Sequence, residues 1–109
     1  MNMKYKTIAG VALAYCSIAQ AHHSAAAFDT DAEIVVEGVV RSYEWTNPHV
    51  YIELEQALGD ETVVWEIEGQ SPAFLRRIGW TAESIRIGDR VSARGSPGRN
   101  PGRRILLLE

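Results

Sequence analysis

Apolar and polar residues alternate along three stretches in the first half of the chain. The stretches cover residues 33–45, 49–55 and 62–68, and a period of two is typical of β-strands with one buried face. Gly38 is expected to mark a bulge or bend, and residues 56–61, with Gly59 and Asp60, are expected to form a hairpin turn. The inward positions predicted by this alternation are Ile34, Val36, Val40, Val50, Ile52, Leu54, Val63, Trp65 and Ile67.

The period changes after residue 70. Ser71 and Pro72 have the chemistry of a helix cap and first helical position, so a short helix is expected over 73–78, ending at Gly79. A turn over 82–85 follows, and then strands over 90–95 and 103–108 around a Pro/Gly-rich loop. The resulting order, β-β-β-α-β-β, predicts a mainly β protein. It would be a small five-stranded barrel like the OB-fold, with one short helix. A small α+β sheet with an open edge is the alternative.

The first 21 residues have the pattern of a secretory signal peptide. Lys4 and Lys6 precede a short apolar run, and Ala19 and Ala21 form a small-x-small cleavage site. An uncleaved anchor and a lipoprotein attached at Cys16 are the alternatives. Cleavage after Ala21 would leave a flexible arm (22–32) and a barrel domain (33–109). The expected location is the periplasm or the medium, with no membrane span after cleavage.

The chain has 109 residues and a mass of 12.1 kDa, enough for one domain. Its only cysteine and both methionines lie within the expected signal peptide. The mature chain would therefore form no disulfide, and it would bind a metal only through nitrogen and oxygen atoms.

Charge is divided unevenly along the chain. Residues 22–75 contain eleven acidic residues and one arginine, whereas residues 76–109 contain eight arginines and three acidic residues. Cross-strand ion pairs on a solvated surface would explain this uneven distribution of charge, and they need no binding function. Nucleic-acid binding by the basic half is disfavoured, because the protein is expected to be exported and the whole chain has a net charge of −3.

The three histidines carry the most specific chemistry. Cleavage would make His22 the first residue and His23 the second, and His49 follows a proline turn between two predicted strands. The α-amine and ring of an N-terminal histidine chelate a metal together, and a distant imidazole completes a three-nitrogen set. Copper(II) favours such a set, so His22, His49 and His23 are candidate ligands. The alternative is that these residues form a polar arm and a turn, with Glu44, Glu53 or Asp29 pairing with the rings.

A second hypothesis is a metal-free module that binds a small molecule or a protein. Trp45, Tyr51 and Arg99 would form its ligand face, because aromatic residues in the first hairpin and a Gly/Pro-rich loop suit recognition. The structural alternative is that the tryptophans belong to the core or its rim. The chain has no phosphate loop and no nucleophile elbow, so no enzymatic activity is expected.

The chain resembles a family of small exported bacterial proteins known only as domain of unknown function 6152. His22-His23-Ser24 and the run EWTNPH at 44–49 carry most of the resemblance. Trp65-Glu66, Gly79-Trp80 and Gly88-Asp89 add to it. The resemblance implies export and a small β-rich domain, and it supplies no activity, substrate or site residues.

Overall fold

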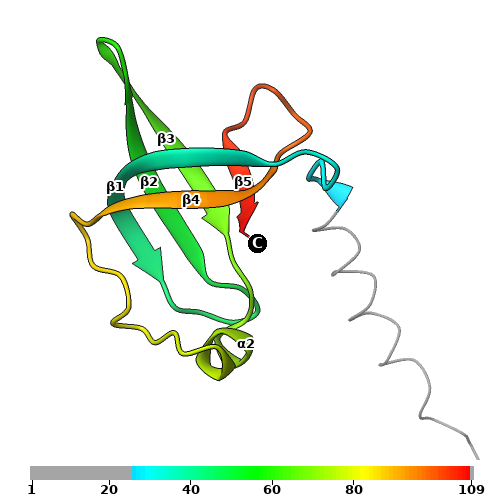
Figure 1. The fold of residues 1–109 in the computed structure, drawn as a ribbon, viewed down its shortest axis with the longest axis vertical. Coiled ribbons are helices and arrows are strands. Elements are labelled where there is room, and N and C mark those ends of the chain that lie inside the picture. Colours follow the sequence, from blue (N-terminus) through cyan, green and yellow to red (C-terminus); the bar gives the residue numbers. More distant parts are fainter. Residues whose placement is uncertain (1–25, 109) are drawn as a thin grey trace, which may run out of the picture.

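Five strands and one short helix make up the described part of the protein (Figure 1). The structure is a computed structural model that describes residues 26–108. The mainly β, OB-like architecture expected from the sequence is confirmed. The elements are β1 (Ile34–Glu44), β2 (Tyr51–Leu58), β3 (Glu61–Glu68), α2 (Pro72–Arg77), β4 (Arg90–Pro97) and β5 (Ile105–Leu108).

The strands close into a barrel in the order β1-β2-β3-β5-β4. Two long-range pairings close the barrel. β1 pairs antiparallel with β4, beginning with Ile34 opposite Gly95, and β3 pairs in parallel with β5. The remaining neighbours are antiparallel. An open-edged sheet, the alternative to a barrel, is therefore excluded.

The inward positions predicted by alternation form the core. Leu54, Ile67 and Leu106 are fully buried, and Val36 and Val40 are almost so. Each comes from a strand in which every second side chain points inward, so the barrel interior is one continuous apolar cluster. Trp65 packs against this cluster and donates its indole N–H to Gln56 Oε1 at 3.0 Å.

The register irregularity of β1 lies at a different residue from the bulge expected at Gly38. The register with β2 shifts between Val40 and Ser42, so the irregularity lies at Arg41 rather than at Gly38. Gly38 is required for another reason: a Cβ there would lie 2.5 Å from the carbonyl oxygen of Glu55 on the neighbouring strand. Close backbone approach, not a bulge, therefore explains this glycine.

The expected turn over 56–61 is too long. Leu58 pairs with Glu61, so only Gly59 and Asp60 form the loop, with Gly59 at a φ of 62°. A positive φ at the first loop position is a requirement of the tight turns that match strand twist. β2 also begins later than expected, at Tyr51, which leaves His49 in the connection that precedes it.

Helix α2 begins as the cap chemistry predicts. The Ser71 hydroxyl accepts a hydrogen bond from Phe74 N at 3.2 Å, and Pro72 is the first helical residue. Only Pro72 and Leu75 are buried, so this six-residue helix covers little of the barrel end. Among residues 26–108 there is no helix of the length and hydropathy needed to cross a membrane.

Candidate metal-binding site

The connection between β1 and β2 holds His49 above the end of β3. Thr46 donates its hydroxyl to the carbonyl of His49 at 3.2 Å. Val50 then exchanges backbone hydrogen bonds with the segment after β3, donating to Gln70 and accepting from Gly69 at 2.7 Å. These bonds extend the β2–β3 pairing beyond the strands and fix the position of the histidine backbone.

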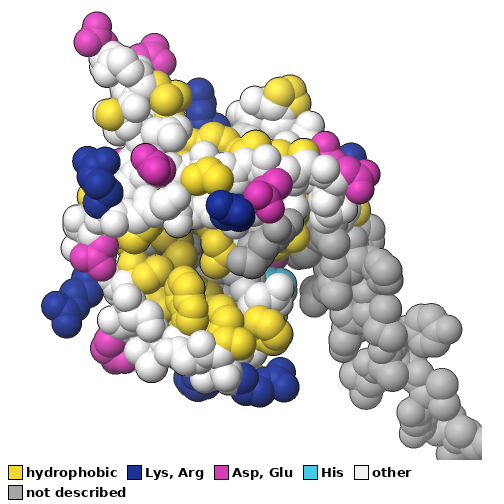
Figure 2. Space-filling model, viewed as in Figure 1, with side chains coloured by type: hydrophobic (Ala, Val, Ile, Leu, Met, Phe, Trp, Pro, Cys, Tyr) yellow, Lys and Arg dark blue, Asp and Glu magenta, His cyan; other side chains and the backbone are white. Residues whose placement is uncertain are grey.

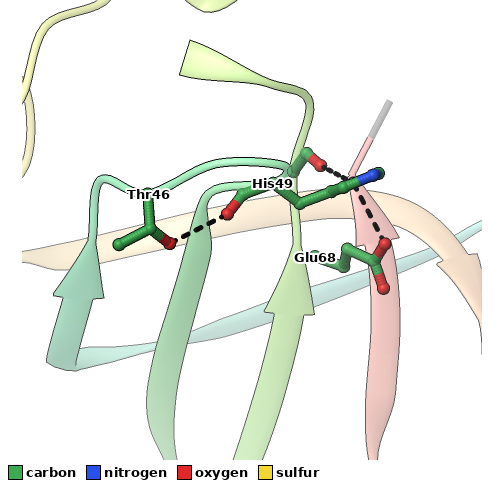
Figure 3. A network of polar contacts seen from close by, with 4 residues as sticks. Thr46, His49 and Glu68 are labelled. Carbon is green, nitrogen blue, oxygen red and sulfur yellow. Dashed lines mark hydrogen bonds and ion pairs between the residues drawn. The ribbon is translucent and has the colours of Figure 1, made fainter.

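One ring nitrogen of His49 faces two acceptors (Figure 3). Nδ1 lies 3.1 Å from the carbonyl oxygen of Gly69 and 3.1 Å from Glu68 Oε1. Because both neighbours are acceptors, the ring proton belongs on Nδ1, where it donates to Gly69. Nε2 then keeps its lone pair. The His49 side chain is 29% exposed, so Nε2 can bind a cation.

Glu68 is the polar partner that the sequence did not identify. Its side chain is only 13% exposed, and in the described part of the chain Oε1 is buried without a hydrogen bond of good geometry. The sequence candidates for pairing with histidine were Glu44, Glu53 and Asp29, and the structure brings none of them to His49. Strand parity places Glu68 on the outer face, but only the register of β2 with β3 sets it beside the histidine.

The outer face of β2 and β3 next to His49 is acidic. Glu53 lies directly opposite Glu66, and Tyr51 lies opposite Glu68. Burial raises the pKa of the Tyr51 hydroxyl, and the charges of Glu68 and Glu66 raise it further. Arg41 forms ion pairs with Glu53 at 3.4 Å and with Glu55 at 4.0 Å, whereas Glu66 forms none with the described residues. This face therefore favours cations over anions.

The arm before β1 packs against this part of the barrel. Phe28 is 3% exposed and forms a β-bridge with Gly98. Asp29 N donates to Pro97 at 2.8 Å, and Arg99 N donates to Ala27 at 2.9 Å. Ala27, Phe28 and Glu68 line one hollow of about 160 Å³, together with Glu66, Arg103 and Ile105. The end of the arm that the structure describes is thus fixed beside the carboxylate that contacts His49.

The other predicted ligands, His22 and His23, lie outside the described residues. Residues 26–108 contain no group of three histidine or carboxylate side chains placed to hold a metal. Within that range, the predicted metal site is represented by His49 with Glu68 beside it.

The residues of the predicted ligand face lie in three separate surroundings. Trp45 stacks edge-on with Tyr43 at 6.1 Å and has the guanidinium of Arg76 over its ring. Tyr51 lines a shallow hollow with Ser42, Glu44, Glu53 and Glu66, which neither Trp45 nor Arg99 lines. Arg99 belongs to the loop that holds the arm.

The chain matches a known protein family. A family model described as "Family of unknown function (DUF6152)" matches residues 10–106, which is most of the chain. It agrees with the resemblance noted from the histidine-containing motifs. No protein of curated function matches the chain.

Proposed function

The chain belongs to the DUF6152 family, whose function is unknown, and we propose that it is an exported copper(II)-binding module without catalytic machinery of its own. In this proposal, cleavage after Ala21 makes His22 the first residue. The α-amine and ring of His22 and Nε2 of His49 bind the metal, and His23 is an additional or alternative ligand. The main support for this proposal is that Nδ1 of His49 faces two acceptors, which leaves the lone pair of Nε2 available to a metal.

The surroundings of His49 match those of metal-binding histidines. Such residues donate their second ring N–H to a carboxylate or a backbone carbonyl, which fixes the tautomer and makes the free nitrogen more basic. Gly69 and Glu68 offer both kinds of acceptor at 3.1 Å. Glu68 adds a negative charge close to the ring, which favours a bound cation.

Docking of the arm makes convergence of the ligands feasible. Ala27 lies at the hollow that Glu68 also lines, and His22 precedes Ala27 by five residues. A chain of five residues spans at most about 17 Å when extended. The N-terminal amine is therefore covalently confined to the neighbourhood of the arm's docking site, so binding does not require ordering of a long free tail.

The donor set favours copper(II) over zinc. An amine and imidazole nitrogens suit the tetragonal geometry of copper(II), and copper(II) has the highest affinity in the divalent series for such ligands. Cleavage would also remove the only cysteine and both methionines, the sulfur ligands that suit copper(I).

The test is a copper(II) titration of protein that has been exported and processed, with intact mass confirming a start at His22. Electron paramagnetic resonance would report the number of nitrogen ligands. We expect one copper per chain, an affinity at least a hundredfold lower for His49→Gln, and a similar loss when one alanine precedes His22. Glu68→Gln should weaken binding by about 10–100-fold, as is usual when a histidine's orienting partner is removed.

Glu53→Gln is the matched control, because this glutamate lies on the same acidic face without contacting His49. The copper affinity of this variant should differ from that of the parent protein by no more than a few-fold. An affinity no higher than that of a free His-His-Ser peptide, unchanged by His49→Gln, would refute the proposal and favour a metal-free binding module.

A further inference from the structure

An apolar groove opens at the end of the barrel that α2 leaves uncovered. It has a volume of about 380 Å³, and core residues Ile52, Ile67 and Ala93 line it. Figure 2 shows the apolar side chains gathered in a hollow between β4 and α2. The groove is distinct from the His49 site, because no residue lines both it and the hollow beside Glu68.

Unequal strand lengths create this groove. β5 pairs with β4 only from Gly95 to Pro97, whereas β4 begins five residues earlier, at Arg90. The stretch Val91–Arg94 pairs with β1 on one side and, within the described chain, has no strand on the other. The groove lies along this edge of β4, and residues 91–94 all line it.

The chemistry of the lining is apolar with an anion-binding group at the rim. Trp80, Ile85, Val91 and Leu108 supply the walls, and Ser92 and Arg94 are the other residues that line the groove. The side chains of Arg94 and Glu33 are 68% and 50% exposed and form an ion pair at 3.6 Å, a contact weak enough to be replaced by a ligand. A mostly apolar cleft with a few polar groups is the usual form of a small-molecule site.

The charge around the groove favours an anionic ligand. Arg94 is the only charged residue that lines it, and it belongs to the half of the chain that contains eight arginines and three acidic residues. In the described structure, Arg94 is the only one of those arginines that forms an ion pair. Arg94 lines neither hollow on the acidic outer face of β2 and β3, so an anion bound at Arg94 would not meet those carboxylates.

We propose that this groove binds a single-chain anionic amphiphile, such as a fatty-acid carboxylate. The alkyl chain occupies the groove, and the carboxylate replaces Glu33 as the partner of Arg94. The volume lies at the lower end of the range for ligand pockets, about 300–1,000 Å³, which suits one alkyl chain rather than a larger ligand. The proposal is independent of copper binding.

The test uses the metal-free mature protein and two probes of equal chain length, decanoate and decyltrimethylammonium, both below their micelle concentrations. The readout is the set of tryptophan indole N–H signals in a nitrogen–proton correlation spectrum. We expect saturable shifts of the Trp80 signal with decanoate. The Trp65 signal is an internal reference, because the Trp65 indole N–H is hydrogen-bonded to Gln56 and Trp65 does not line the groove.

Two variants test the placement of the ligand. Arg94→Gln should weaken decanoate binding about tenfold, through loss of a charge-assisted hydrogen bond. Arg90→Gln is the matched control: this exposed arginine is on the same strand but lines a different hollow, so affinity should be unchanged. Ile85→Trp should abolish binding by filling the groove, and a thermal melt would verify that this variant folds.

Three results would overturn the proposal. One is the absence of a Trp80 shift with decanoate. Another is equal affinity for decyltrimethylammonium, which would remove the role assigned to Arg94. The third is binding to phosphatidylglycerol vesicles without binding to monomeric decanoate, which would identify the groove as a membrane-docking surface instead.

Discussion

Replacing Phe28 with alanine should destabilise the whole domain, although this residue precedes the first strand. Phe28 is 3% exposed, and its burial accompanies the β-bridge to Gly98. Removing a buried phenylalanine costs about 3–5 kcal/mol, and we expect about 3 kcal/mol, because the end of the arm can partly relax. A domain of this size has a total stability of roughly 4–13 kcal/mol, so the loss is a large fraction of it.

Thermal unfolding followed by circular dichroism would measure this effect. For a domain of this length, about 3 kcal/mol corresponds to a decrease of about 12–24 °C in the unfolding temperature. The matched control is Phe74→Ala, since the chain has two phenylalanines and Phe74 is 42% exposed on α2. We expect less than about 1 kcal/mol for the control. Equal and small shifts for the two variants would show that the arm is not docked in solution.

Three further predictions concern the fold. Gly95→Ala should lower the free energy of unfolding in urea by about 3 kcal/mol or more, because a Cβ there would overlap the Leu107 carbonyl. Gly102→Ala is the control and should be nearly neutral, because its Cβ would meet only Asn100 Oδ1 at 3.3 Å. Glu66→Lys should stabilise by about 0.5 kcal/mol by facing Glu53 with an opposite charge, and the gain should vanish in 1 M salt. Burial, and then the charge of Glu83, raises the pKa of Tyr43 above its ordinary value of 10.0. The contribution of the protonated Tyr43 to the free energy of unfolding is therefore complete below pH 10, and it is lost as the pH rises through the folded-state pKa. Tyr43→Phe should therefore lose less stability between pH 9 and 12 than the parent protein does, and a parallel decline in both would contradict the assignment.

Local patterns predicted most of the fold. Alternation identified the strands and their inward residues, and the Ser71-Pro72 pair identified the start of α2. The features that were missed depend on contacts between distant segments. Phe28 is one aromatic residue among small and polar ones, so nothing local shows that it is buried beside Gly98. The irregularity at Arg41 and the close approach at Gly38 are likewise set by the neighbouring strand.

The site could be predicted only in part. His49 was identified as a candidate because few residue types bind metals, but its partner Glu68 depends on the register of β2 with β3. The apolar groove was not predicted, because it arises from the difference in length between β4 and β5. No pattern within either strand reveals that mismatch.

Closure of the barrel by distant pairings has a consequence for how the chain folds. Ile34 and Gly95 are about sixty residues apart, and Glu66 and Ile105 about forty. Contacts of such high sequence separation make folding slow, in the range of milliseconds to seconds, and the entropy of closing the chain is lost before most native contacts form. Among the described strands, β5 comes last in the sequence, and it joins β3 to β4. A chain that lacks it has two open edges, so incomplete copies would tend to aggregate rather than persist as a partial barrel.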